Sequence, residues 1–414
     1  MSSWRSGSAA KGAGDEKGTA AVRILVLSPT FLPVVGGAEL LLLGLCRRLS
    51  ARHEVRLLTP SLPDSLVREQ GSEEYDSLVT FPVERYHDRV SFMKIPGHRW
   101  TAGAIPPFSL SAVTAVWRAV KAFRPQVLNV HYLMPTGLAG LVAERWLGVP
   151  TVVTLNGRDV PGPGVPALWR WWQRALLACV SDATFISRYC RDAICGSGSE
   201  QGHIVYAGVD MPSGQEDAGS LRRRLDIPEG EPVIFSLQRL GREKRVEMLL
   251  RAFHHCYRQT GTGVLVLGGK GPEEPALRAL VEELGIDKQV RLAGYIPQQA
   301  LGSFYSGCDL FAFHSTFETF GVALAQAMAY GKPVVTVRNT ALPEVVGDGG
   351  LIAETGDWRG LGGAMARVIT DQPLRTRLGQ AARQRAQALF DWDRIVEQHE
   401  AVLAQAAGKS GHAA

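Results

Sequence analysis

The chain has 414 residues, which is long enough for two domains with separate hydrophobic cores. Hydrophobic residues make up 45% of it and charged residues 21%, as in ordinary globular proteins. The net charge of +5 is compatible with an anionic substrate or membrane surface, but it is too small and too dispersed to indicate a nucleic-acid-binding protein.

The chain begins with a predicted disordered lead at residues 1–20, which is rich in Ser, Gly, Ala and charge and lacks the apolar core of a signal peptide. Residues 407–414 have a similar composition and predict a flexible tail. No apolar run approaches the roughly twenty residues that a membrane span needs. The six cysteines form no CxxC pair, so we expect a cytoplasmic protein with neither a zinc site nor a disulfide framework.

From Val22 onward, apolar strands alternate with helices. "VRILVLSP" is typical of a strand buried in a parallel sheet, and "GGAELLLLGLCRRLSARH" predicts a helix that begins at its glycines. The pattern continues through "EVRLLTP", "PQVLNVHY", "TGLAGLVAERWLG", "PTVVTLNG", a Trp-rich helix and "DATFIS". It predicts a doubly wound, Rossmann-like α/β domain over residues 21–206.

A polar segment rich in Gly and Pro, residues 207–220, predicts an interdomain linker. A second alternation runs from "EPVIFSLQRL" to "DGGLIAE" and predicts a second Rossmann-like domain over residues 207–388. The helix "DWDRIVEQHEAVLAQA", within the predicted segment 389–406, is expected to pack back on the first domain. Ligands of such sheets bind at the carboxyl ends of the strands, so we expect a cleft between the domains.

A candidate anion site follows the first strand of the second domain. This strand ends at Arg239, and Glu243 and Lys244 come at the next helix start. Cationic side chains beside a helix N-terminus can bind phosphate, although the same pattern is typical of a solvated charge cluster. The glycines of "TGVLVLGGKGPEE" match neither a dinucleotide fingerprint nor a P-loop.

The segment "FHSTFETFGVALAQAMAYGKPVV", residues 313–335, carries the second candidate. Glu318 precedes a helix that is expected to begin at Phe320 and Gly321, and Gln326 lies on that helix. The free amides of a helix start can hold a phosphate. The carboxylate and the amide could then bind hydroxyl groups on either side of it, as in a sugar nucleotide.

This segment resembles the signature of the family 4 retaining glycosyltransferases, "E-G-F-G-…-E-A-M-A-x-G-x-P-V-V". The resemblance covers nearly the whole ordered chain and implies the GT-B architecture, in which two Rossmann-like domains face each other across a cleft. Within the predicted second domain, the chain departs from the family pattern at several positions. Gln238, Arg245 and Thr319 stand where the family has glycine, and Gln326 stands where it has a second glutamate.

The resemblance implies roles for residues of the second domain. Glu318 would contact hydroxyls of the donor sugar, and Arg239 and Lys244 would neutralise the diphosphate. Gln326 would hold the ribose hydroxyls. The implied diphosphate-binding backbone lies at Phe320, Gly321 and Val322, and the implied base pocket at Tyr295 and Ile296.

In the first domain, Gly36 and Gly37 of "GGAE" resemble the family's loop that approaches the diphosphate and the acceptor. His131 follows a strand where the family keeps a histidine close to the transferred sugar. A lone histidine there is more often part of the core, but the "PTG" that follows and the expected cleft favour a ligand contact, so we count His131 with Arg239, Lys244 and Glu318 as a candidate catalytic residue. "TLNGRDV" resembles the family's "T-H-G-x-D-V", with Asn156 in place of histidine and Asp159 retained, and both are expected on the acceptor side of the cleft.

The resemblance therefore implies a retaining, metal-independent glycosyltransferase. It would use a nucleotide-diphosphate sugar as co-substrate, without a cofactor, and a hydroxyl on a glycan or lipid-linked acceptor, in the synthesis of cell-surface glycan, polysaccharide or glycolipid. Two alternatives come from other classes. One is a GT-B epimerase that converts a nucleotide sugar without an acceptor, and the other is a non-catalytic subunit that binds a nucleotide sugar.

The segment "LWRWWQR", residues 168–174, concentrates Trp and Arg on one predicted helix. Such a helix could lie in a membrane interface, at the inner face of the membrane, or pack on a neighbouring helix. The sequence favours neither interpretation.

Overall fold

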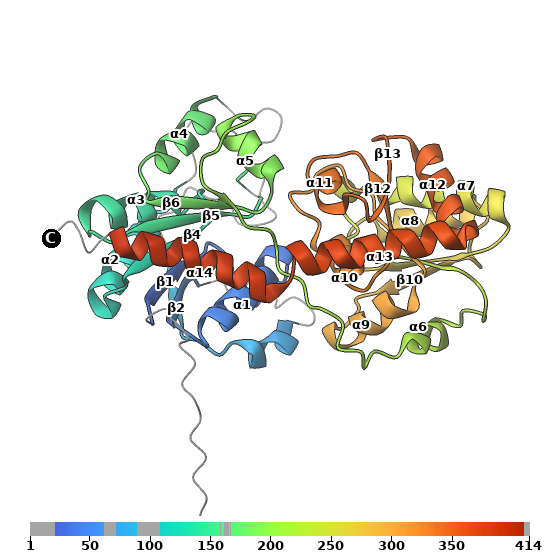
Figure 1. The fold of residues 1–414 in the computed structure, drawn as a ribbon, viewed down its shortest axis with the longest axis horizontal. Coiled ribbons are helices and arrows are strands. Elements are labelled where there is room, and N and C mark those ends of the chain that lie inside the picture. Colours follow the sequence, from blue (N-terminus) through green and yellow to red (C-terminus); the bar gives the residue numbers. More distant parts are fainter. Residues whose placement is uncertain are drawn as a thin grey trace, which may run out of the picture.

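The computed structural model describes residues 21–61, 72–88, 108–157, 159–160, 165 and 167–409. The predicted lead at 1–20 and residues 410–414 of the predicted tail lie outside the described residues. The described chain forms two parallel sheets, one in each half of an elongated molecule (Figure 1). The prediction of two Rossmann-like sheets is thereby confirmed.

The first sheet has the strand order β3-β2-β1-β4-β5-β6-β7. Its strands are β1 (Arg23–Leu27), β2 (Glu54–Pro60), β3 (Val83–Tyr86), β4 (Val127–His131), β5 (Thr151–Leu155), β6 (Asp182–Phe185) and β7 (His203–Ile204). Every residue of β4 and β5 is buried, because helices cover both faces of the sheet.

Different helices cover the two faces of this sheet. α2 (Leu110–Phe123), α3 (Gly137–Trp146) and α4 (Ala167–Leu177) contribute to the larger core, whereas α1 (Gly37–Leu49) and α14 (Trp392–Lys409) contribute to a second core on the other face. The 3₁₀ helix η1 (Ser72–Leu78) and α5 (Arg188–Cys195) complete this half.

The second sheet has the strand order β10-β9-β8-β11-β12-β13. Its strands are β8 (Val233–Leu237), β9 (Val264–Gly268), β10 (Val290–Gly294), β11 (Leu310–Ala312), β12 (Val334–Val337) and β13 (Gly350–Ala353). Its helices are α6 (Ala218–Leu225), η2 (Arg242–Lys244), α7 (Val246–Thr260), α8 (Glu274–Glu283), α9 (Gln298–Gly307), α10 (Val322–Ala329), α11 (Leu342–Val346), α12 (Trp358–Thr370) and α13 (Gln372–Leu389).

The strand order reverses between β1 and β4 in the first sheet and between β8 and β11 in the second. At such a point, the chain segments that follow the two neighbouring strands run in opposite directions. Their divergence opens a crevice for a ligand at the carboxyl ends of the strands. α1 follows β1, and the segment with Arg239 and Lys244 follows β8. These candidate residues therefore lie directly after the strands at which the strand order reverses, which are the switch points of the two sheets.

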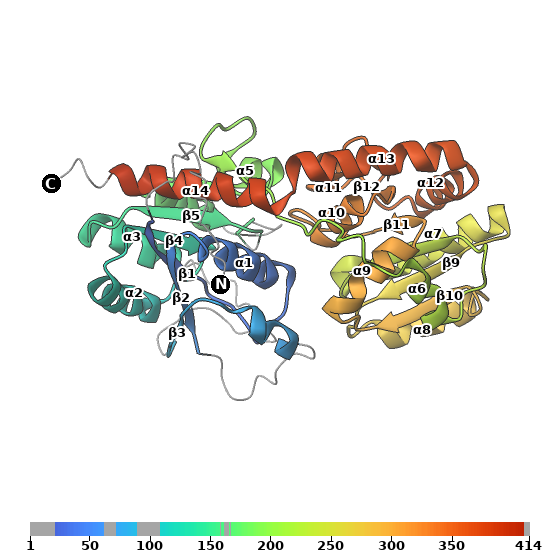
Figure 2. The same cartoon turned by 60° about the horizontal axis from the view of Figure 1, so that its bottom comes forward.

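The C-terminal helices cross from one half to the other. α13 lies along the second half, and α14 continues along the first half, where it packs on α1, β4, β5 and β6 (Figures 1 and 2). At the crossing, the Val209 N–H donates to the Phe390 carbonyl at 2.9 Å. The Trp392 ring fits against Gly44 and Gly208, where an added Cβ would come within 2.5 Å and 2.3 Å of the ring.

Three predicted limits need correction. α14 extends to Lys409, so residues 407–409 are helical and do not belong to a tail. The predicted linker, 207–220, already contains the first turn of α6. α10 begins at Val322 because Gly321 has φ 92° and caps the helix instead of opening it. The domain boundaries at 206/207 and 388/389 remain predictions.

Candidate active site

A cavity of about 520 Å³ lies between the two halves of the molecule. Its walls come from the start of α1, the segment after β8, the segment after β10 and the start of α10. Most of the residues singled out by the sequence line it, namely Gly36, Gly37, Asn156, Arg239, Lys244, Tyr295, Ile296, Glu318, Phe320, Gly321 and Val322. His131, Asp159 and Gln326 do not line it.

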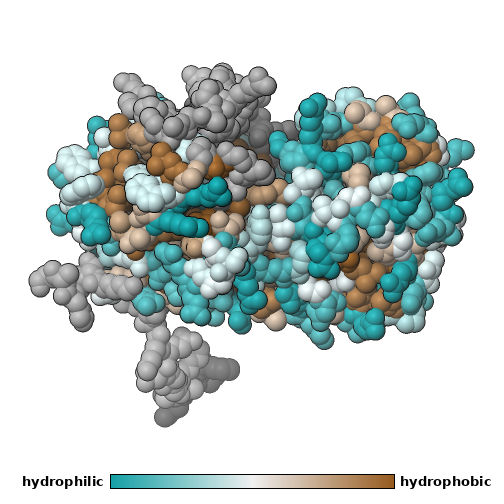
Figure 3. Space-filling view, turned by 90° about the horizontal axis from the view of Figure 1, so that it is seen from above, coloured by the Kyte–Doolittle hydropathy of each residue, from teal (hydrophilic) through white to brown (hydrophobic). Residues whose placement is uncertain are grey.

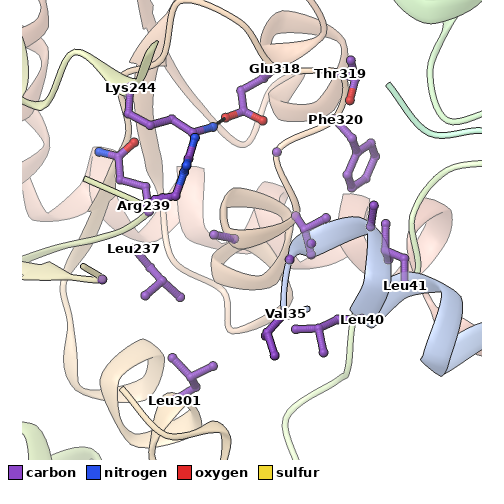
Figure 4. Close-up of a pocket in the computed structure, with 18 of the residues that line it drawn as sticks. Val35, Leu40, Leu41, Leu237, Arg239, Lys244, Leu301, Glu318, Thr319 and Phe320 are labelled. Atoms are coloured by element: carbon purple, nitrogen blue, oxygen red, sulfur yellow. Dashed lines mark hydrogen bonds and ion pairs between the residues drawn. The ribbon is translucent and has the colours of Figure 1, made fainter. Parts of the chain in front are cut away.

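Charged side chains gather at one end of the cavity. Lys244 Nζ contacts Glu318 Oε1, and both side chains are largely buried (Figure 4). Arg239 pairs with Glu243, but its side chain is 69% exposed. The lysine is therefore held in place against the acid, whereas the arginine can reorient toward an anionic ligand.

Two helix starts point their backbone amides at the same cavity. The residues that precede α1 and α10 are Gly36 and Gly321. Because glycine has no side chain to cap a helix, first-turn N–H groups such as those of Val322 and Ala323 remain available to an anion, whereas the Leu324 N–H donates to the Gly321 carbonyl. The Phe320 side chain is buried, with its ring 5.2 Å from that of Phe390, so Phe320 offers its backbone to the cavity.

The other end of the cavity is apolar. Val35 and Leu40 from the first half and Leu237 and Leu301 from the second lie away from the Lys244–Glu318 pair (Figure 4). Sequence reasoning missed these four residues, because an apolar side chain at the end of a strand or on a helix has the same pattern whether it faces a core or a cavity.

His131 is buried beneath the cavity wall. Only 2% of its surface is exposed, and its two ring nitrogens lie 2.9 Å from Asn129 Oδ1 and 3.0 Å from Asn156 Nδ2. Burial, with a smaller contribution from His399, lowers the pKa of His131 to about 3. Among these residues, Asn156 is the one that lines the cavity.

Asp159 holds the loop after β4 instead of facing the cavity. Its Oδ1 accepts hydrogen bonds from the N–H groups of Leu133 at 2.6 Å and Met134 at 3.4 Å. Its carbonyl accepts one from Gln173 Nε2 at 2.6 Å. Burial raises the pKa of the Asp159 carboxyl to about 7. A role toward the acceptor remains a prediction from the resemblance.

Gln326 binds the chain segment that joins the two halves. Its Nε2 donates to the Asp210 carbonyl at 2.5 Å, and its Oε1 accepts from the Asp210 N–H at 3.1 Å. The amide thus uses both its donor and its acceptor on one backbone residue. The ribose-binding role remains a prediction from the resemblance.

Several hydrogen bonds join the two halves, among them one from the Gln298 N–H to Glu74 and those made by Thr319 and Glu344. The Thr319 hydroxyl donates to the Asn156 carbonyl at 3.2 Å. The Glu344 carboxylate of α11 accepts hydrogen bonds from the N–H groups of Arg188 at 2.9 Å and Tyr189 at 3.2 Å, at the start of α5. Sequence reasoning noted Thr319 as a departure from glycine but could not show what it contacts.

Two facing Rossmann-like sheets, with a charged and partly apolar cavity between their switch points, define the class of GT-B glycosyltransferases. Residues 35–211 match the model described as "Glycosyltransferase Family 4", and residues 217–385 match "Glycosyl transferases group 1". The chain belongs to the family 4-type glycosyltransferases, which confirms the resemblance seen in the sequence.

The relatives agree with this assignment. The chain is 25% identical to the N-acetyl-alpha-D-glucosaminyl L-malate synthase of Bacillus anthracis, over 91% of this chain and 96% of that protein. It is 27% identical to a GDP-mannose-dependent alpha-mannosyltransferase of Mycobacterium tuberculosis, over 76% and 78%. The crystal structure of Anabaena HepE in complex with UDP shares the fold, with a TM-score of 0.73, 22% identity and coverage of 92% and 100%.

Proposed function

We propose that this protein transfers a sugar from a nucleoside-diphosphate sugar to a hydroxyl acceptor, with retention at the anomeric carbon and without a divalent metal ion. One observation carries the proposal: a single cavity combines an apolar end with a charged end at two uncapped helix starts. The relative named as GDP-mannose-dependent and the UDP complex of HepE support a nucleotide-sugar donor.

The cavity suggests how the donor would lie. The base would occupy the apolar end beside Tyr295 and Ile296, and the diphosphate would face the first turn of α10. The sugar would then lie next to Glu318 and the wall made by Asn156. Hydrogen bonds from Glu318 to sugar hydroxyls would set the position of the anomeric carbon.

In the reaction, the bond between the anomeric carbon and the diphosphate oxygen breaks, and a bond to the acceptor oxygen forms on the same face of the sugar. The acceptor proton passes to the departing diphosphate. Arg239, Lys244 and the helix amides would stabilise the negative charge that develops there, which is the task a metal ion performs in other transferases. Neither of the two relatives named above supports the epimerase or the non-catalytic alternative.

A screen of nucleotide sugars tests the proposal. UDP-, GDP- and ADP-sugars are added during thermal unfolding, and at least one is expected to raise the melting temperature, since a ligand that binds the folded state stabilises it. Glu318→Ala and Arg239→Ala are each expected to abolish most of the transfer. NMR of the product reports the anomeric configuration, and activity in EDTA reports metal dependence. Failure of every donor to protect the protein would refute the proposal.

One face of the first half fits an anionic membrane surface. On the packed helices α2, α3 and α4, the exposed side chains include Trp117, Trp146, Leu168 and Trp171. Trp172 instead packs against the core, which supports the packing interpretation for that residue, whereas the exposed Trp171 is available to a membrane surface. Figure 3 views the molecule from the side on which α4 lies in Figure 1 and shows hydrophobic side chains on this half.

The charges on these helices favour the same partner. α2, α3 and α4 carry the basic residues Arg118, Lys121, Arg145, Arg170 and Arg174, all exposed. The acidic residue on these three helices is Glu144, whose carboxylate accepts hydrogen bonds from the Thr151 N–H and the Ser181 hydroxyl. Exposed tryptophans beside basic residues favour the interface of an anionic membrane. In the described part of the chain, no helix is long and apolar enough to cross a bilayer.

We therefore place this face at the inner side of the membrane, where a lipid-linked acceptor would be found. Co-sedimentation with vesicles that contain phosphatidylglycerol is expected to be strong in low salt and reduced by Trp171→Ala combined with Arg170→Ala. Equal binding to vesicles of phosphatidylcholine alone would refute the electrostatic part. Equal binding of the double variant would exclude α4 from the contact.

A further inference from the structure

A chain of buried polar groups leads from the middle of the first sheet to the cavity wall. It begins at Asn129 on β4, which is 1% exposed. Asn129 Nδ2 lies 3.1 Å from the Val152 carbonyl and 2.9 Å from Thr154 Oγ1, both on β5. A backbone carbonyl can only accept a hydrogen bond, so the NH₂ group of Asn129 must face β5. Asn129 Oδ1 therefore faces His131.

This orientation decides the tautomer of His131. Nε2 lies 2.9 Å from Asn129 Oδ1, and an amide oxygen can only accept, so Nε2 must carry the hydrogen. Burial keeps the ring neutral, with a pKa of about 3. Nδ1 of the neutral ring therefore has a free lone pair and acts as an acceptor.

The tautomer in turn orients Asn156. Its side-chain amide lies 3.0 Å from His131 Nδ1 and must donate there through Nδ2. Asn156 Oδ1 then points away from the histidine. Asn156 is itself one of the residues that line the cavity. In the described part of the chain, Asn156 Oδ1 has no hydrogen-bond partner, while the Asn156 carbonyl is held by Thr319. The side chain is thus held on one side and open on the other.

We propose that Asn129 and His131 are positioning residues that hold Asn156 Oδ1 toward the cavity, where it accepts a hydrogen bond from a hydroxyl of the transferred sugar. The donor sugar is the source of this hydroxyl because Thr319, which binds Asn156, follows Glu318 directly in the chain. This inference rests on the proposed function. It makes His131 a residue that acts through Asn156, since both ring nitrogens are engaged and the ring does not reach the cavity.

The experiment compares two ligands that differ only in the sugar. Dissociation constants are measured for UDP and UDP-glucose, and for GDP and GDP-mannose, and the pair with the tighter nucleotide sugar is used. The dissociation constant of the nucleoside diphosphate, divided by that of the nucleotide sugar, is the ratio that reports the contribution of the sugar to binding. Asn156→Ala is expected to lower this ratio about tenfold, as for the loss of one buried hydrogen bond, and to leave binding of the nucleoside diphosphate unchanged.

Two substitutions at His131 test the positioning role. His131→Leu removes the acceptor for Asn156 Nδ2, so the sugar contribution should fall as far as in Asn156→Ala, and no further in the double variant. His131→Asn can place an oxygen near the site of Nδ1 and should restore part of the ratio. Thr184→Val is the matched control, because it removes a 3.0 Å hydrogen bond to Thr154 from the same buried network, away from the cavity.

The outcomes separate this inference from the proposed function. If no nucleotide or nucleotide sugar protects the wild-type protein, the proposed function fails. If the wild type favours the nucleotide sugar and Asn156→Ala keeps the full ratio, the inference fails alone. An unchanged ratio in folded His131→Leu refutes the positioning role. ¹⁵N NMR of the wild-type histidines gives an independent reading, and a hydrogen on Nδ1 of His131 at neutral pH would overturn the inference even if His131→Leu does not fold.

Discussion

The hydroxyl of Thr319 donates a hydrogen bond to the backbone carbonyl of Asn156 across the cleft, at 3.2 Å. It joins the segment before α10 to the segment after β5, and both residues line the cavity. Both also depart from the family pattern, which has glycine and histidine at these positions. A glycine has no hydroxyl, so this chain has a tie between its two halves that the family pattern does not provide.

We expect Thr319→Val to lower the free energy of unfolding by about 1 kcal/mol, because the valine keeps the volume but cannot donate the hydrogen bond. Urea unfolding measures the difference. Thr319→Ser keeps the hydroxyl and serves as the control. If Thr319→Val and Thr319→Ser are equally stable, the hydrogen bond contributes nothing to the joining of the two halves.

Gly157 faces Thr319 so closely that a side chain would not fit. An added Cβ would lie 2.2 Å from Thr319 Oγ1, and Gly157 has φ +126°, a conformation that favours glycine. Gly157→Ala should therefore destabilise the protein by roughly 1–3 kcal/mol. The double variant with Thr319→Gly removes the collision but not the backbone strain, so it should recover only part of the loss. Full recovery would show that the backbone conformation is unimportant.

Lys244 and Glu318 contact each other, and we expect their substitutions to have different effects on ligand binding. Lys244→Ala should weaken binding of the nucleoside diphosphate and lower the rate of transfer by about 10²–10³-fold, because it removes a charge that faces the leaving group. Glu318→Gln should keep or strengthen nucleoside diphosphate binding while it weakens the sugar contribution. Calorimetry with the nucleoside diphosphate and with the nucleotide sugar separates these effects. If both variants changed the two affinities in the same way, the assignment of Lys244 to the phosphates and Glu318 to the sugar would be refuted.

Gln326→Glu restores the residue of the family signature, but a carboxylate cannot donate to the Asp210 carbonyl. We expect it to lower the free energy of unfolding by about 1 kcal/mol, which urea unfolding measures. The same variant tests the ribose contact implied by the resemblance. Tighter donor binding would support that contact, whereas unchanged or weaker binding would limit Gln326 to holding Asp210.

The buried Asp159 carboxyl predicts a pH dependence of stability. Burial raises its pKa from 3.8 to about 7, so between these values the folded protein keeps a proton that the unfolded chain has released. The stabilising contribution is full below about pH 4 and is lost as the pH rises through about 7.

Asp159→Asn cannot titrate and should lack this dependence. Relative to the wild type, the variant should gain stability between pH 5 and pH 8 by an amount on the order of a few kcal/mol, since one pKa unit corresponds to about 1.4 kcal/mol. Urea unfolding at both pH values measures the difference. A constant difference would show that Asp159 is already ionised at pH 5 in the folded protein.

Much of the fold could be predicted because its signals are local. The strands around Ile24 and Val266 are nearly continuous apolar runs, as buried parallel strands require, and glycines precede α1 and α10 at Gly36 and Gly321. The exact end of α14 could not be predicted, since small and polar residues near Lys409 suit both a helix and a tail.

The candidate site divides in the same way. Arg239, Lys244 and Glu318 stand out in the sequence because charged residues directly after buried strands or before helices suggest a ligand. Leu237 and Leu301 do not stand out, because an apolar residue gives no local sign of facing a cavity. The same holds for the Asn129–His131–Asn156 contacts, which join neighbouring strands far apart in the chain.

By itself, the sequence determined the two parallel sheets and the chemical types gathered at their carboxyl ends, since both follow from apolar periodicity and from motifs within one segment. The tertiary structure decided which of those residues reach the cavity. It placed Asn156 at the wall with His131 behind it, and it turned Gln326 to the backbone of Asp210. The physical reason is that a hydrogen bond depends on the direction and distance of two groups, which here are set by strands and helices from distant parts of the chain.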